Sequence, residues 1–406
     1  MTPQIDTAWL DAEFRRLLDF GRNVGLPDGG AGYLDDRGVV DPVHGVQTYI
    51  TARMAHVYCV GALAGVPGCL PVADAALAGL AGRLADEQCG GWFHALSDGV
   101  PDVTKTCYDH AFVMLAASSA VVAERPGAEA LLARATATFL EHFWDDDAGL
   151  VVDTWDREFR AADAYRGLNS TMHSVEAMLS VASAVGGDEG LAWVARAERA
   201  ARFVAQLSTG YDGRLPEHFN SDWVPDLELN RDRPGDQFKP YGATPGHGLE
   251  WARLLLHTRA ALGDDDAELL AAAVRLFARA VADGWAADGA DGFCYTTDWA
   301  GAPVVRDRMH WVVAEGINTA AVLAQVTDGT AAGQPSGYTD WYQAWWAYAD
   351  RYLIDREGGS WWHELDPSNR PARTVWPGKP DLYHVVQATL VPRLPRWPMV
   401  AAAVRS

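Results

Sequence analysis

The sequence of 406 residues has few cysteines and no long apolar run. Its cysteines are odd in number and lack CxxC spacing, which is typical of reduced residues in the core of a cytoplasmic protein. They are Cys59, Cys69, Cys89, Cys107 and Cys294. No apolar stretch approaches the roughly 20 residues that span a bilayer, and the N-terminus lacks the basic and apolar regions of a signal peptide. We therefore expect a cytoplasmic protein with no membrane partner.

Basic residues are also scarce. The chain has 33 Lys and Arg against 54 Asp and Glu, for a formal charge of −21. Nucleic acid requires clustered Lys and Arg, so no nucleic-acid partner is expected. The same charge disfavours strongly anionic substrates, although a local basic pocket could override it. GxSxG, P-loop and Rossmann fingerprints are missing, so the sequence suggests no nucleotide cofactor.

No linker or low-complexity tract divides the chain, so we expect residues 1–406 to form a single domain. Most of the sequence repeats apolar residues at spacings of three and four, the pattern of amphipathic helices. The clearest segments are rich in alanine, a strong helix former. These segments are 74–86, 127–142, 191–206 and 266–282.

Six similar passages separate the helical segments. Each begins with a glycine, continues with aromatic or β-branched residues, and ends in Asp and turn residues. The glycines are Gly32, Gly91, Gly149, Gly213, Gly292 and Gly359, at intervals of 58 to 79 residues. Such a period indicates a repeat architecture. An open solenoid would need polar capping repeats, whereas six helical hairpins closed into a ring would need none. We predict an all-α (α/α)6 barrel with short β-hairpins or irregular loops at one end.

A histidine follows each glycine passage, near the beginning of the next expected helix. These residues are His56, His110, His173, His247, His310 and His384. If the six helices line one barrel, their imidazoles gather at one mouth, and some of the 17 tryptophans could provide flat walls for sugar rings. The other six histidines follow no such pattern and are assigned structural roles. They are His44, His94, His142, His218, His257 and His363.

Metal binding is an alternative wherever histidines cluster. The sequence has no HExxH or CxxC motif and no paired His-x-His. Six histidines around a ring could still hold an ion, but we expect no metal.

Polar companions accompany several of these histidines. Arg53 lies three residues before His56, and Glu176 three residues after His173, so each pair shares a helical face. Asn169 belongs to the same face as His173. A sugar-sized site would use such groups to bind hydroxyls.

The segment with the clearest local signals is YGATPGHGLEW, residues 241–251. Thr244 as N-cap and Pro245 at the first position predict a helix start. His247 then lies in the first turn, where the helix dipole disfavours imidazolium, and a neutral imidazole suits a general base. Glu250 either orients that ring, binds a hydroxyl, or is an ordinary carboxylate of the helix start.

Two further units supply candidates. His310, Trp311 and Glu315 begin an otherwise apolar helix, so Glu315 is either paired in the core or faces a cavity. Trp376 and Asp381 precede His384 after a Pro- and Gly-rich loop, which could place the last histidine close to a ligand.

Taken together, the segments TARMAHVY, NSTMHSVEA, ATPGHGLEW, HWVVAEG and WPGKPDLYH resemble the N-acylglucosamine 2-epimerase superfamily, most closely its branch of aldose–ketose isomerases. The resemblance covers about residues 8–394. It implies an (α/α)6 barrel and proton transfer between C1 and C2 of a reducing sugar without cofactor or metal.

The resemblance also assigns roles to residues. His247 and His384 match the family's two essential histidines, Arg53 its substrate-binding arginine, and Glu250 its glutamate beside the first histidine. The remaining pocket candidates are Asn169, His173, Trp311, Trp376, Glu315, His110, His56, Asp381 and His310. We expect His247 to assist ring opening and His384 to move the C2 proton to C1, while Arg53 stabilises the enediolate.

The segment Asp236–Pro240 is not an obvious clamp for an anion, so a neutral monosaccharide is expected, with D-mannose and D-fructose as the interconverted pair and a monomer or weak homo-oligomer as the assembly. A 2-epimerase is the nearest alternative. A glycoside hydrolase would need two opposed carboxylates, such as Glu176 and Glu250, and a non-catalytic binding ring is the third possibility.

Overall fold

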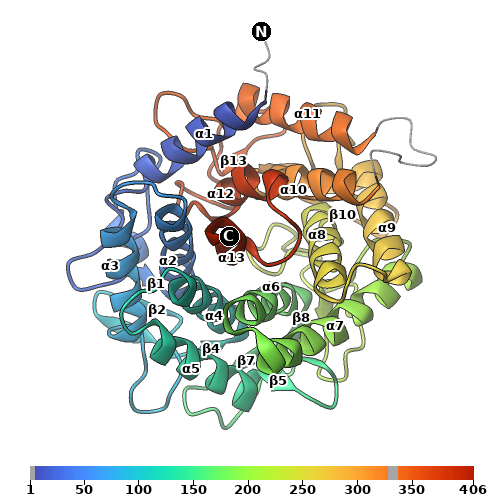
Figure 1. Cartoon of the computed structure of the whole chain (residues 1–406). Coiled ribbons are helices and arrows are strands. Elements are labelled where there is room, and N and C mark those ends of the chain that lie inside the picture. The colour runs from blue at the N-terminus through green and yellow to red at the C-terminus, as the bar shows by residue number, and fades with distance from the viewer. Residues whose placement is uncertain (1–4, 328–336) are drawn as a thin grey trace.

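The computed structural model describes residues 5–327 and 337–406, which form two concentric rings of helices (Figure 1). The inner helices are α2 (Thr48–Leu63), α4 (Cys107–Val122), α6 (Leu168–Val185), α8 (Pro245–Ala261), α10 (His310–Val326) and α12 (Tyr383–Leu390). The outer helices are α1 (Thr7–Phe20), α3 (Cys69–Ala81), α5 (Ala128–Thr138), α7 (Gly187–Gly210), α9 (Ala267–Gly284) and α11 (Tyr338–Tyr348). The predicted (α/α)6 barrel is confirmed.

The ring closes through the two ends of the chain. Each inner helix from α2 to α10 packs against the outer helix that follows it, but α12 packs against α1 and against its inner neighbours α10 and α2. The N-terminal helix therefore completes the sixth hairpin. This closure satisfies the apolar faces that an open array would leave at its two ends.

Inner and outer helices differ in their sequence patterns because they differ in surroundings. In α9 the buried residues follow helical spacing, with Leu269, Leu276 and Ala280 on the face toward the inner ring. In α2 every residue from Thr48 to Gly61 is buried. All four segments with the clearest predicted periodicity, including 74–86, correspond to outer helices; α3 begins earlier and ends at Ala81 before Gly82.

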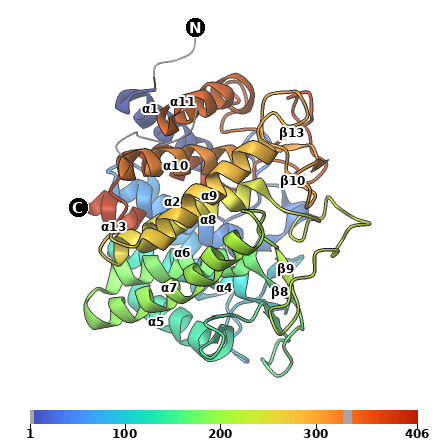
Figure 2. The same cartoon turned by 90° about the vertical axis from the view of Figure 1, so that its right-hand side faces the viewer.

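Short antiparallel strands occupy one end of the barrel. They are β1 (Val46–Gln47), β2 (Ala95–Ser97), β3 (Val100–Asp102), β4 (Lys105–Thr106), β5 (Trp144–Asp145), β6 (Leu150–Val151), β7 (Thr154–Trp155), β8 (Arg166–Gly167), β9 (His218–Phe219), β10 (Thr296–Thr297), β11 (Pro303–Val305), β12 (Arg308–Met309) and β13 (Glu364–Leu365). The pairs β4–β7, β8–β9 and β12–β13 each join the strand just before an inner helix to the loop that follows the next outer helix. The strands thus fix the mouth where the inner helices begin (Figure 2).

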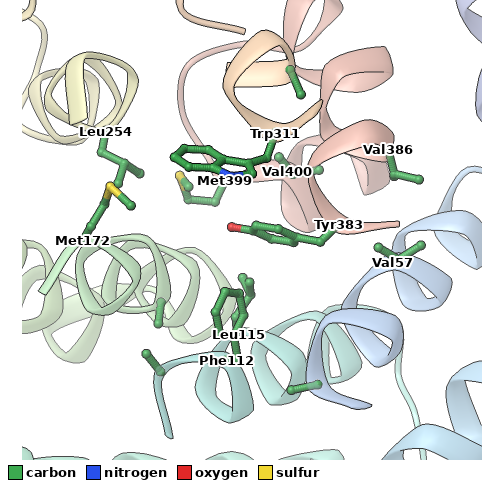
Figure 3. Packing of buried hydrophobic residues seen from close by; sticks show 14 of the residues in the cluster. Val57, Phe112, Leu115, Met172, Leu254, Trp311, Tyr383, Val386, Met399 and Val400 are labelled. Carbon is green, nitrogen blue, oxygen red and sulfur yellow. The ribbon is translucent and has the colours of Figure 1, made fainter. Parts of the chain in front are cut away.

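The opposite end is closed by the C-terminal segment. Its helix α13 (Val400–Arg405) packs against α2, α4 and α6 and lies away from the strands in Figure 2. Apolar side chains from each inner helix pack near the axis, among them Phe112, Trp311 and Tyr383, beside Met399 and Val400 (Figure 3). Within the described residues, no helix is long and apolar enough to cross a membrane.

Four short non-α helical segments complete the fold. They are the 3-10 turns Pro42–His44 and Val391–Arg393 and the π-helical turns Phe139–Phe143 and Ala349–Leu353. The two π turns extend the outer helices α5 and α11. All five cysteines are unpaired, in agreement with the reduced thiols expected from the sequence.

Candidate active site

A cavity opens at the strand-bearing mouth of the barrel, with about 600 Å³ of space free of protein atoms when the solvent at its opening is included. Ten of the thirteen predicted residues line it: Arg53, Asn169, His173, His247, Glu250, His310, Trp311, Trp376, Asp381 and His384. They come from five of the six inner helices and from the loop before α12. The remaining three, Glu315, His56 and His110, lie outside the lining.

His247 is positioned by the start of α8. The helix begins at Pro245 with Thr244 as N-cap, as predicted, although the Thr244 hydroxyl makes no capping bond. The side chain of His247 contacts Glu217 rather than Glu250, with 2.9 Å between Nδ1 and Oε2. The expected orientation of this ring by Glu250 is therefore wrong. Glu217 lies 30 residues earlier in the chain, just before β9.

His384 has a comparable carboxylate partner. Its Nδ1 lies 3.0 Å from Oε1 of Glu315, so Glu315 acts on the cavity through this histidine. Burial, with the charge of Arg53 close by, holds the pKa of His384 well below its ordinary value, and the ring is neutral near pH 7.

Trp311 packs against both of these histidines. Its ring centroid is 5.1 Å from that of His247 and 5.8 Å from that of His384, with both imidazoles tilted by about the same angle, 35° and 36°. Gly246 makes this packing possible, because a Cβ there would lie 2.5 Å from ring carbons of Trp311. The glycine of the PGHG segment thus has a steric function.

Arg53 supplies a fixed positive charge to the cavity. Its Nη1 donates to Asp381 at 3.0 Å and its Nη2 to the hydroxyl of Tyr108 at 2.8 Å. The guanidinium also lies 4.4 Å from the centroid of Phe112. Its Nε has no hydrogen-bond partner among the described residues. The group is therefore rigidly held, and its Nε–H is left unpaired within the described part of the chain.

A buried charge cluster lies around Arg253, which the sequence reasoning did not identify. Its Nε donates to Glu315 at 2.7 Å, its Nη2 lies 3.4 Å from Glu250 and its Nη1 lies 3.7 Å from Glu176. Burial and the Glu315 carboxylate raise the pKa of Glu250 well above its ordinary value. Because Glu250 has the longer contact with Arg253, it is the member of this pair that retains a proton more readily.

The remaining cavity imidazoles are neutral near pH 7. Burial lowers the pKa of both His173 and His310 to about 4. His310 stacks on His363 with 3.7 Å between centroids, and His363, assigned a structural role from sequence, lines the cavity too. These rings offer hydrogen bonds to hydroxyls but no positive charge to an anion.

Two predicted residues do not reach the cavity. His110 lies two residues after Tyr108, a rotation of about 200° around α4; it accepts from the Trp92 amide and contacts the Thr106 carbonyl, outside the barrel axis. His56 begins the third turn of α2, about 12 Å below its start. It contacts Ser119 and lines a separate small cavity near α13. The six histidines do not share one mouth.

Two loops form the roof of the cavity. Phe238 packs edge-on against Tyr49, Tyr108 and Trp376, with centroid distances of 5.6 to 6.1 Å. The loop that carries Trp376 is fastened by the buried Glu364 carboxylate, which accepts from the backbone amides of residues 374, 375 and 376 at 2.7 to 2.9 Å. Neither Phe238 nor Glu364 belongs to a histidine motif, although Phe238 falls in the long polar loop of residues 220–240.

The carboxylates also have the composition of a metal site. Glu250 combines with His173 and Glu176, or with Glu315 and His384, within 4.8 Å. Arg253 contacts all three glutamates, however, and its positive charge would repel a cation bound among them. These residues fit a bound metal poorly.

The fold and this site define the class to which the chain belongs. The model of the N-acylglucosamine 2-epimerase (GlcNAc 2-epimerase) family matches residues 29–388, so the chain is a member of that family.

Two curated relatives are similar over nearly their full length. A D-mannose isomerase of Thermobifida fusca is 48% identical over 98% of this chain and 96% of its own. A D-mannose isomerase of Pseudomonas cannabina pv. alisalensis is 43% identical over 98% and 94%. Among solved structures, a crystal structure of D-mannose isomerase superposes with a TM-score of 0.86 at 25% identity, covering 97% of this chain and 99% of that one.

Proposed function

We propose that this protein is an aldose–ketose isomerase that interconverts D-mannose and D-fructose. The observation that carries the proposal is the pair His247 and His384, each held at Nδ1 by a glutamate and each packed against Trp311. Similarity to the two D-mannose isomerases over nearly the whole chain supports the choice of sugar.

The pair of histidines divides the chemistry. With Nδ1 engaged, Nε2 is the nitrogen that each ring offers to a substrate; none of the described residues hydrogen-bonds it. His247 assists opening of the pyranose. Nε2 of the neutral His384 then takes the proton from C2, the C–H electrons form the C1–C2 double bond, and the carbonyl electrons move onto O1. His247 then moves the O2–H proton to O1, so the negative charge of the cis-enediolate passes from O1 to O2.

The second half returns the proton. His384 gives its proton to C1, the C1–C2 double-bond electrons form the new C–H bond, and the electrons on O2 form the ketone at C2. Arg53 stabilises the negative charge on the oxygens during both halves, because preorganised donors at a developing charge contribute a few kcal/mol. No proton is gained or lost overall, and the chemistry requires only side chains of this chain.

The neutral walls of the cavity favour a neutral sugar. His173, His310 and His363 carry no charge near pH 7, and the Asp381 carboxylate already occupies Arg53. A glycoside hydrolase is less well supported, because Glu176 is held by Tyr383 and Gln387 and does not line the cavity.

A product scan tests the proposal. D-mannose, D-glucose, D-fructose, D-lyxose and N-acetyl-D-mannosamine would each be incubated with the protein, with and without EDTA, and the sugars resolved by chromatography. We expect fructose from mannose in both conditions. Glucose without fructose would identify a 2-epimerase instead, and loss of activity in EDTA would contradict the metal-free mechanism.

A further inference from the structure

We propose that Glu217 is a positioning residue for His247, and that its carboxylate makes this imidazole the one that carries the extra proton while the sugar ring opens. The inference rests on the proposed isomerase function and deepens it. It assigns different roles to His247 and His384 because their carboxylate partners have different surroundings.

The carboxylate of Glu217 is rigidly placed. Its backbone carbonyl accepts from the amide of Leu168, the first residue of α6, at 3.0 Å, and the next residue, His218, pairs with Gly167 across β8 and β9. The side chain is 4% exposed. Oε2 contacts His247, whereas Oε1 is buried and has no hydrogen-bond partner among the described residues. His247 is therefore the group that balances the carboxylate.

Four titratable groups around Glu217 and His247 are uncharged near pH 7, so they do not weaken the attraction between the carboxylate and the imidazole. Burial lowers the pKa of His218 on β9 and lowers that of His173 on α6 to about 4. Burial also raises the pKa of Tyr165 before β8 and of Tyr295 before β10. All four are neutral near pH 7.

The remaining charged or titratable groups nearby interact with residues other than Glu217 and His247. Lys239 lies 3.7 Å from the centroid of the Tyr165 ring and acts electrostatically on Asp153. Asp236, on the same loop, accepts from the amides of Phe238 and Lys239. Glu250, on the same helix as His247, contacts Arg253 instead.

Glu315, the partner of His384, differs from Glu217 because it also contacts an arginine. Its second oxygen accepts from Arg253 Nε at 2.7 Å, so an arginine already neutralises part of its charge. Arg53 adds a second positive charge close to His384. A carboxylate facing only an imidazole stabilises imidazolium, while one shared with an arginine does so less. His247 is thus suited to hold a proton, and His384 to begin as a neutral base.

In the ring-opening step His247 serves as both the base and the acid. Nε2 takes the proton of the anomeric hydroxyl, the O–H electrons form the C1 carbonyl, and the C1–O5 electrons leave with O5. The imidazolium, stabilised by Glu217, then gives the same proton to O5. The histidine returns to its neutral form, and one proton has moved from O1 to O5.

Glu217→Gln tests the charge separately from the geometry. The amide oxygen of Gln can still accept from Nδ1, so the ring keeps its orientation and loses only the anionic partner. We expect kcat on mannose to fall about tenfold or more, because the imidazolium formed during ring opening loses its anionic partner. The pH–rate profile of the variant then differs from that of the unmodified protein.

Deuterium at C2 identifies the slowed step. With C2-deuterated mannose, the isotope effect on kcat falls toward unity in Glu217→Gln, because ring opening limits the rate. In the matched variant Glu315→Gln, which alters the partner of His384, the isotope effect is retained or increased. An unchanged isotope effect and pH profile in a folded Glu217→Gln would overturn the inference.

Two further measurements distinguish a failure of this inference from a failure of the isomerase proposal or of folding. Polarimetry of α-D-mannopyranose mutarotation follows ring opening without isomerisation, and we expect Glu217→Gln to accelerate it less than the unmodified protein does. If the unmodified protein yields no fructose but this difference remains, the isomerase proposal fails and the inference about Glu217 stands. If Glu217→Gln does not fold, Glu217→Asp retains the charge, and the inference requires it to preserve the pH profile at a reduced rate.

Discussion

Arg253 and Glu315 form a fully buried ion pair near the barrel axis, with 2.7 Å between Nε and Oε2. Because the other oxygen of Glu315 contacts His384, the pair couples the charge balance of the core to a histidine of the cavity. Glu176 and Glu250 complete the cluster. One arginine thus accompanies three carboxylates in a region from which water is largely removed.

Replacing Arg253 tests this balance through stability. Arg253→Met leaves the glutamates without their cation, and removing one partner of a buried pair costs about 3–5 kcal/mol. We expect a loss of this size in the free energy of unfolding measured by urea titration. Adding Glu315→Gln recovers part of it, because one charge then disappears. Arg231→Met, at an exposed pair with Glu228, serves as the control and changes stability by less than about 1 kcal/mol.

His384→Asn tests the proposed base. The change removes the group that would take the C2 proton while retaining a polar side chain, and general acid–base catalysis contributes about 10²–10⁴-fold. We expect kcat for fructose formation to fall within that range, measured by chromatography, with the unfolding midpoint little changed. The control is His44→Asn, since His44 stacks on Tyr33 outside the cavity. Equal activities in the two variants would refute the assignment.

Gly246→Ala tests the steric role of the glycine before His247. The added Cβ would lie 2.5 Å from Trp311 and 2.7 Å from Val312, so Trp311 must move from its position against the two histidines. We expect kcat/KM for mannose to fall about tenfold or more, since small displacements of a catalytic group are costly. Gly248→Ala is the matched control on the same helix, because its Cβ would make only ordinary contacts at 3.6 Å and beyond.

The buried histidines predict a loss of stability in acid. Burial lowers the pKa of five of them to about 4: His56, His110, His173, His257 and His310. Between about pH 6.5 and 4 the unfolded chain binds protons that the folded chain does not, so each contributes a slope of up to about 1.4 kcal/mol per pH unit. This stability is present above pH 6.5 and lost as the pH falls.

Urea titrations from pH 7.5 to 5 would measure this slope. We expect the midpoint to be highest near pH 7, with a small decrease above it and a steep decrease below pH 6, the latter shallower in His56→Gln, which lacks one such group. His94 acts in the opposite sense, because Asp109 raises its pKa to about 9; its contribution is present below pH 6.5 and lost as the pH rises through about 9. A midpoint independent of pH between 7 and 5 would contradict the linkage.

Much of the barrel and part of the cavity follow from local sequence patterns. The glycine-marked repeat, the alanine-rich outer helices and the start of α8 at Pro245 are each encoded within a few neighbouring residues. Repeat position also brought His173, His247, His310 and His384 together as candidates, and the structure places all four at the cavity.

The partners of those residues were decided by the tertiary structure. Glu217 and Glu315 lie 30 and 69 residues from the histidines that they contact, and no periodicity links them. His56 and His110 occupy the predicted repeat positions yet leave the cavity, because each residue along a helix turns the side chain by about 100° and moves it about 1.5 Å. The sequence by itself determined which helices line the barrel. Only their rotation, depth and closure into a ring decided which side chains face the sugar-sized cavity and which carboxylate holds each imidazole.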